Sequence, residues 1–295
     1  MSIKNYSAKA PNPKIIKAIE NYLFDASIPL KPLYDQLMAY EVSANESGDA
    51  KLKQKLMNGL KSLAIHKNNV SPLLKKCLAK NVRTLAMDLP IEIKSTKLSN
   101  SKNIVVIAMD PLSPLEQPEP EKDFIGYWTP FSLVDSETTG EKSYQANSTF
   151  FSTLVKEYNV YITDIYKLFY RIGDYPADER SNRDPEYLSL IDSIHIPLLN
   201  FELEVMQPDA IITLGNNARN ALLQLNNISP ESWDDIQVYS WENKATKKAT
   251  PLICLPHISG TANGTSTKIL AKYPEITGTK TERMAQLILK TIQNL

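Results

Sequence analysis

The stretches VYITDIYK (residues 160–167) and PDAIITLG (208–215) decide the fold of this chain. Each begins with or contains an apolar, β-branched run and continues into polar residues or a glycine. Two further stretches share this pattern, namely IVVIAMDP (104–111) and LICLPHISG (252–260). Continuous apolar runs of this length are typical of strands that are buried on both faces of a parallel sheet. The four stretches therefore predict an α/β fold.

Three of these strands end next to a side chain that is suited to chemistry, namely Asp110, Asp164 and His257. Ligands of open α/β sheets bind at the carboxyl ends of the parallel strands. Two carboxylates and one imidazole are therefore expected to converge at one edge of the sheet. The alternatives are that Asp110, which precedes a proline, only forms a turn, and that His257 is structural.

Strands and helices alternate along residues 103–295. Strands are expected at 104–108, 159–163, 210–214 and 252–256, and helices at 148–157, 185–206, after Gly215 and at 284–293. This alternation predicts a three-layer sandwich with helices on both faces of a central, mostly parallel sheet. The chain has 9 glycines and no GxGxxG motif after a strand, which argues against a dinucleotide-binding enzyme.

The first hundred residues have a different pattern. Leucine, methionine, alanine and isoleucine recur with helical spacing at 32–40, 49–65 and 71–82. Pro90 and the polar stretch 94–102 indicate a linker. A small all-helical domain at 1–100 is therefore expected to precede an α/β catalytic domain at 101–295.

The net charge of zero hides an asymmetry between these two parts. Residues 1–100 contain 16 Lys and Arg against 8 Asp and Glu, whereas the remainder contains 17 against 25. A basic module attached to an acidic body is typical of proteins that bind a polyanion. Lys51, Lys53 and Lys55 are the expected DNA contacts, and the alternative is that these lysines only keep a helical surface soluble.

Composition argues against several other classes. No apolar run approaches the roughly 18 residues of a membrane span, and the N-terminal segment lacks the apolar core of a secretory signal. Two cysteines, Cys77 and Cys254, are too few for a disulfide framework or a cysteine metal cluster. A cofactor-free monomer in a reducing cytoplasm is the expectation.

The order and spacing of the motifs resemble the uracil-DNA glycosylase superfamily. AMDP (108–111) is similar to its GQDPY-like motif, WTPFSLV (128–134) to its GLAFSV segment, VYITD (160–164) to VYITN, and PHIS (256–259) to HPS. This resemblance covers residues 103–295 and implies a monofunctional DNA glycosylase that flips a base out of DNA and leaves an abasic site. The branches of the family with an iron–sulfur cluster need four thiolates, so no such cluster is expected.

The resemblance also implies roles for single residues. Asp110 would orient the attacking water and stabilise the cationic sugar, and His257 would donate to O2 of the departing base. Phe131 would stack on the flipped base, unless it is only a core aromatic, and Trp128 would be a further wall of the pocket. Ser259 would contact a DNA phosphate.

Ile258 stands in place of the proline of the HPS motif, and three further positions depart from the family pattern. Met109 and Leu112 stand in place of the glutamine and the tyrosine of GQDPY, and Asp164 stands in place of the asparagine that binds the uracil edge. An ionised aspartate only accepts hydrogen bonds, so O4 of uracil repels it whereas the N4 amino group of cytosine can donate to it. Leu112 in place of tyrosine opens the pocket beside C5. Both changes favour a cytosine that carries a substituent at C5.

Modified cytosines of this kind suit phage DNA, so antiviral defence is the expected setting. One alternative is the repair of uracil or of another deaminated base. Another is a catalytically inactive module that binds nucleic acid. An enzyme for free nucleosides or RNA is a third, although the basic N-terminal part argues against free nucleosides. Residues 261–266 contain no leucine or arginine that would serve as a wedge in the duplex.

Overall fold

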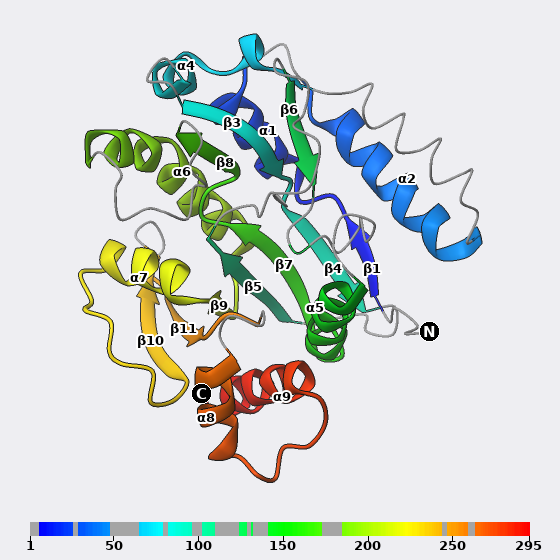
Figure 1. Cartoon of the computed structure of the whole chain (residues 1–295), viewed down its shortest axis with the longest axis vertical. Helices are drawn as coiled ribbons and strands as arrows, with labels where there is room; N and C mark the ends of the chain where they lie inside the picture. Colours follow the sequence, from blue (N-terminus) through cyan, green and yellow to red (C-terminus); the bar gives the residue numbers. More distant parts are fainter. Residues whose placement is uncertain are drawn as a thin grey trace.

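The computed structural model describes eleven segments of the chain, shown as ribbons in Figure 1. They are residues 6–25, 29–47, 65–78, 82–95, 102–109, 124–128, 131, 141–172, 185–243, 247–258 and 263–295. Within these segments, no helix is both long enough and apolar enough to cross a membrane.

A seven-stranded sheet forms the centre of the molecule. Its strands lie in the order β1 (Tyr6–Lys9), β4 (Ile91–Ser95), β7 (Tyr158–Asp164), β5 (Lys102–Ala108), β9 (Ala210–Leu214), β11 (Ala249–Leu255) and β10 (Gln237–Glu242). The four strands from β7 to β11 are parallel to their neighbours, and the outer strands are antiparallel. All five residues of β9 are buried, as expected for a strand covered on both faces.

Helices cover both faces of this sheet (Figure 1). The chain passes from β5 through α5 (Glu141–Leu154) to β7 on one side of β5, and then through α6 (Pro185–Met206) to β9 on its other side. Parallel strands are joined by right-handed crossovers, so these two opposite steps place α5 and α6 on opposite faces. Helix α9 (Lys280–Gln293) packs on α5, and α1 (Pro13–Leu23) packs on α6. The predicted α/β sandwich with a mostly parallel core is confirmed.

Two helices begin with capping signals that are local in the sequence. Thr279 caps α9 by accepting from Glu282 N, and the Glu282 side chain accepts from Thr279 N, which completes the capping box. Ser71 Oγ accepts from Leu74 N over 3.2 Å at the start of α4 (Pro72–Leu78). Proline is favoured at this first helical position because it has no N–H to leave unpaired.

The first hundred residues contain strands as well as helices, which corrects the expectation of a purely helical region. Helices α1, α2 (Lys31–Ser47) and α4 are present, but β1 and β4 pair in the central sheet. The stretch IEI (91–93) lies between Pro90 and the polar stretch 94–102 that indicated a linker. It alternates apolar and polar residues, as a half-buried strand does. Ile91 and Ile93 are fully buried. The expected helix at 49–65 lies outside the described residues except for Ile65, which begins a strand, and a separate role for residues 1–100 stays a prediction.

A second sheet of four strands lies beyond the carboxyl end of β7. Its order is β2 (Ile65–His66), β6 (Phe124–Trp128), β3 (Val82–Asp88) and β8 (Leu168–Ile172). Along the chain, β3 leads into β4 and β7 leads into β8. In the two sheets, β3 pairs antiparallel with β8, and β4 pairs antiparallel with β7. The segments 82–95 and 158–172 therefore form one two-stranded ribbon that runs from the central sheet into the second sheet. Asp88 N donates to the Lys167 carbonyl over 3.0 Å where the ribbon changes sheet.

Candidate active site

The carboxyl ends of the four parallel strands lie at one edge of the central sheet. The register pairs Ala108 of β5 with Asp164 of β7, and Leu255 of β11 with Leu214 of β9. Three of the segments expected to form the site therefore reach the same edge, the one where α/β proteins bind ligands. Asp110 itself lies outside the described residues.

Phe131 and His257 come together at this edge although they are far apart in the sequence. Their ring centroids are 6.0 Å apart, with the planes inclined by 28°. Phe131 also packs on Phe151 of α5, with centroids 5.2 Å apart. A half-buried aromatic ring beside a half-buried imidazole forms a surface on which a flat base could stack.

The backbone of Phe131 has an unusual conformation. Its φ is +59°, in the left-handed region that bulky residues rarely adopt. Asn147 Nδ2 donates to the Phe131 carbonyl over 3.2 Å and helps to hold this conformation. Residues kept in such strained conformations, at a cost of about 1–3 kcal/mol, are concentrated at functional sites. This strain cannot be predicted from the sequence, because it depends on contacts of Phe131 with α5.

His257 lies close to Gly215, the residue that follows β9. Gly215 has a φ of +95°, and a Cβ at this position would lie 3.4 Å from His257 Cβ. Burial, and next the positive charge of Lys280, lower the pKa of His257 below its usual 6.5. At neutral pH the imidazole is therefore uncharged, and it can donate one N–H to an acceptor.

Asp164 is the last residue of β7 and is only 2% exposed. Its main-chain carbonyl accepts a hydrogen bond from the ammonium of Lys167. Lys167 Nζ also lies 2.9 Å from Glu202 Oε2, and both of these side chains are 0% exposed. Sequence reasoning missed Lys167 and Glu202. The available signal was a lysine inside the apolar segment IYKLF (165–169) and a glutamate between the apolar residues Phe201 and Leu203.

A buried histidine lies on the far side of the same turn. Lys167 N donates to His195 Nδ1 over 3.3 Å, and the ring of Tyr166 packs against His195 with centroids 5.5 Å apart. Burial, and next the charge of Lys167, lower the pKa of His195 to about 3. His195 is therefore a neutral hydrogen-bond acceptor, and it was not identified from the sequence.

The remaining predicted site residues are placed only in part. Met109 is half-buried, and its carbonyl accepts from Tyr166 N over 2.9 Å. Trp128 ends β6, where its backbone pairs with Asp88. The other predicted residues lie outside the described part of the chain: Leu112, Ser259, Lys51, Lys53 and Lys55. In the part that is described, no three His, Cys, Asp or Glu residues form a group that could hold a metal ion.

Residues 133–277 match the sequence model of the uracil DNA glycosylase superfamily. This part of the chain belongs to that superfamily. The match includes β7, β9, β11 and His257, and it supports a DNA glycosylase type of function with DNA as the substrate. A search of curated proteins found no significant match to the chain.

An arginine pair occupies opposite positions on two strands of the second sheet. The register of β3 and β8 places Arg83 directly opposite Arg171.

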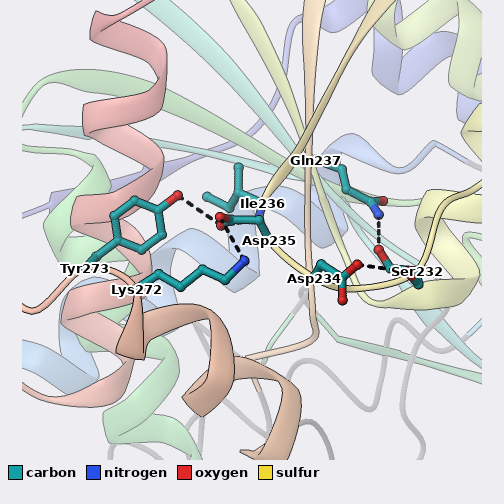
Figure 2. A network of polar contacts seen from close by, with 7 residues as sticks. All are labelled: Ser232, Asp234, Asp235, Ile236, Gln237, Lys272 and Tyr273. Carbon is teal, nitrogen blue, oxygen red and sulfur yellow. Dashed lines mark hydrogen bonds and ion pairs between the residues drawn. The ribbon is translucent and has the colours of Figure 1, made fainter.

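An acidic loop precedes β10 and is drawn in Figure 2. Asp235 Oδ1 accepts from the Tyr273 hydroxyl over 2.9 Å, and its Oδ2 lies 3.4 Å from Lys272 Nζ. Gln237 Nε2 donates to the Ser232 carbonyl over 2.7 Å. The loop is thus tied both to the end of α8 (Asn263–Ala271) and to the start of β10.

A cation–π contact attaches the same loop to α7 (Asn216–Leu225). The guanidinium carbon of Arg219 lies 4.1 Å from the ring centre of Trp233, and Arg219 Nη1 donates to the Glu231 carbonyl over 2.9 Å. Trp233 Nε1 in turn donates to the side chain of Asn216, next to Gly215. The loop is therefore also tied to the start of α7, directly after Gly215.

Proposed function

We propose that the protein is a monofunctional DNA glycosylase that flips out and excises a C5-modified cytosine and leaves an abasic site. The position of Asp164 is the observation that supports modified cytosine as the substrate. It ends β7 at the edge where the strands of the site meet, in the place of the family's asparagine. A buried carboxylate in this place selects against a base edge that presents a lone pair.

Base flipping is the first step of the proposed reaction. Unstacking a base costs a few kcal/mol, which contacts in the pocket must offset. Stacking on an aromatic ring contributes about 1–3 kcal/mol for each base. Phe131 is suited to this role, because its strained backbone holds the ring next to His257 before any base arrives.

Cleavage of the glycosidic bond needs groups of opposite character on its two sides. The sugar becomes cationic, and we assign its stabilisation and the orientation of the attacking water to Asp110, which directly follows Met109. The departing base becomes anionic, and the neutral imidazole of His257 would donate to its O2. Donors aimed at a developing charge are usually the largest single contribution to catalysis.

Selection of the base is assigned to Asp164 and Leu112. The carboxylate of Asp164 would accept from N4 of cytosine, and it would face the lone pairs of O4 in uracil. Leu112, which lacks the hydroxyphenyl group of the family's tyrosine, would leave room beside C5. Met109 and Trp128 are proposed to line the same pocket.

Two charged features of the chain suggest the path of the DNA. The arginine pair of β3 and β8 would attract the phosphate backbone, whereas the acidic loop of residues 231–236 would repel it. The duplex would therefore extend over the second sheet and not over β10. Lys51, Lys53, Lys55 and Ser259 are proposed as further phosphate contacts.

Excision of a modified cytosine would suit the degradation of phage DNA, and we propose antiviral defence as the setting. The substrate class is tested by incubating the protein with duplexes that contain uracil, cytosine, 5-hydroxymethylcytosine or glucosylated cytosine, followed by alkaline cleavage. Strand breaks are expected at a modified cytosine and not at uracil. Asp110→Asn, which should lower the rate at least about a hundredfold, is the control for a contaminating glycosylase.

Two other results would support the alternatives. Breaks at uracil alone would indicate an enzyme for deaminated bases. DNA binding without breaks at any base would indicate an inactive member of the fold that reads flipped bases.

A further inference from the structure

A lysine and a glutamate form an ion pair in the interior of the protein, directly behind the edge that carries Asp164. Lys167 lies in the turn from β7 to β8, and Glu202 lies near the end of α6. Their charged atoms are 2.9 Å apart, and neither side chain is exposed to solvent. Taking two charges out of water is costly, and apolar residues of similar volume often stabilise a fold as well or better. Stability alone therefore gives no reason for this pair.

The ion pair is attached to the end of β7 by two hydrogen bonds. The ammonium of Lys167 donates to the main-chain carbonyl of Asp164. The hydroxyl of Thr163 donates to Glu202 Oε2 over 3.0 Å. Two consecutive residues at the strand end are thus bound to one buried pair, and the second of them is the residue assigned to base selection.

Other contacts hold the turn that follows Asp164. Ile165 N donates to the Ala108 carbonyl over 3.0 Å, which links the turn to β5. Lys167 N donates to His195 Nδ1, and the Lys167 carbonyl accepts from Asp88 N. The turn therefore has partners on β3, β5 and α6. Lys167 makes three of these links. Its side chain pairs with Glu202 of α6, its N–H donates to His195 of α6, and its carbonyl accepts from Asp88 of β3.

We propose that Lys167 and Glu202 are positioning residues that hold Asp164 in the orientation needed to select cytosine over uracil. The inference rests on the proposed function, because it gives a task to the strand end that would read the base. A hydrogen-bonding group must be held within about 0.5 Å of its productive place, and buried partners behind it supply that precision. Loss of the bond from Lys167 to the Asp164 carbonyl would loosen the strand end that carries the Asp164 side chain.

The decisive variant is the double substitution Lys167→Met and Glu202→Leu. It removes both charges together, so no unpaired charge is left in the interior, and such replacements usually preserve folding. The readout is the ratio of kcat/KM for modified cytosine to kcat/KM for uracil. The double variant should lower this ratio at least about tenfold through kcat for modified cytosine, because a misplaced hydrogen bond is lost at the transition state.

Glu20→Gln is the matched control. Glu20 is a buried carboxylate of α1 that accepts from Leu30 N over 2.8 Å, and it has no contact with β7 among the hydrogen bonds of the described residues. The control should lose stability without a change in base preference. A double variant that keeps the wild-type ratio would overturn the inference. If the double variant does not fold, Thr163→Val, which removes one bond to Glu202, takes its place with the same two outcomes.

The preference for modified cytosine over uracil can also be measured as a ratio of dissociation constants, without catalysis. Duplexes with a 2′-fluoro sugar resist cleavage, so dissociation constants for modified cytosine and uracil report the base selection alone. A wild type that prefers modified cytosine but cleaves no substrate would refute the glycosylase proposal, while a double variant without this preference would still support the positioning role. A wild type that binds both bases equally would overturn the positioning role.

Discussion

The ring of Phe131 stacks beside the imidazole of His257, with centroids 6.0 Å apart and planes inclined by 28°. One residue is held in a left-handed backbone conformation, and the other follows the last parallel strand of the sheet. This contact joins the residue assigned to base stacking with the residue assigned to the departing base. It brings both assigned residues together at one edge of the central sheet.

Phe131→Ala should weaken the binding of a flipped base by about 1–3 kcal/mol, roughly ten- to a hundredfold in kcat/KM. Phe131→Gly should cause the same loss of activity. Glycine adopts a positive φ without strain, so the Gly variant should unfold at a higher temperature than the Ala variant. Full activity of both variants would mean that the ring only fills space against Phe151.

Gly215→Ala should reduce both stability and excision. The substitution forces a side chain into a φ of +95° and brings a methyl group to 3.4 Å from His257 Cβ. Backbone strain of this kind costs about 1–3 kcal/mol. Gly264→Ala is the control, because a Cβ there meets no atom within 4 Å and alanine favours the helix. Thermal unfolding and single-turnover excision of the two variants should therefore differ clearly.

The excision rate should show no step at the usual pKa of histidine. The pKa of His257 is lowered from 6.5, so the folded protein keeps the imidazole neutral as the pH falls from 8 to 6.5. The rate should decline only below this range, when the imidazole gains a proton. His257→Ala should lower the rate at least about a hundredfold at neutral pH. A rate that rises as the pH falls through 6.5 would indicate that the protonated imidazole is the active form.

Arg83→Gln combined with Arg171→Gln should weaken DNA binding equally on all sequences. Each lost phosphate contact should flatten the plot of log affinity against log salt concentration by about one unit of slope. The exposed Lys247, which is paired with Glu242 beyond β10, provides the control Lys247→Gln. An unchanged slope for the arginine variant would move the DNA path away from the second sheet.

Much of the fold was predictable from local sequence patterns. Strands β5, β7, β9 and β11 are unbroken apolar runs, and the start of α9 has a capping box that needs only residues close in sequence. The strands β1 and β4 were not predicted. They are short outer strands of the sheet, and their pairing with each other and with β7 depends on partners far away in the chain.

The site was predictable to a smaller extent, for a physical reason. Residues at strand ends, such as Asp164 and His257, can be found because parallel strands share one edge. A buried ion pair cannot be found in this way, since Lys167 and Glu202 look like surface charges until α6 packs behind β7. The conformation of Phe131 is likewise set by tertiary contacts, including the hydrogen bond from Asn147.

The central claim is that the side chain at position 164 selects cytosine over uracil. Its most direct test is single-turnover excision by the wild type and by Asp164→Asn on two duplexes that differ only in one base, a C5-modified cytosine or uracil. The wild type should cleave the modified cytosine faster, and Asp164→Asn should reverse this preference, because mismatching one buried hydrogen-bonding edge costs about 1–3 kcal/mol, or roughly ten- to a hundredfold in rate. Efficient excision of uracil by the wild type, together with an unchanged preference in Asp164→Asn, would contradict the claim.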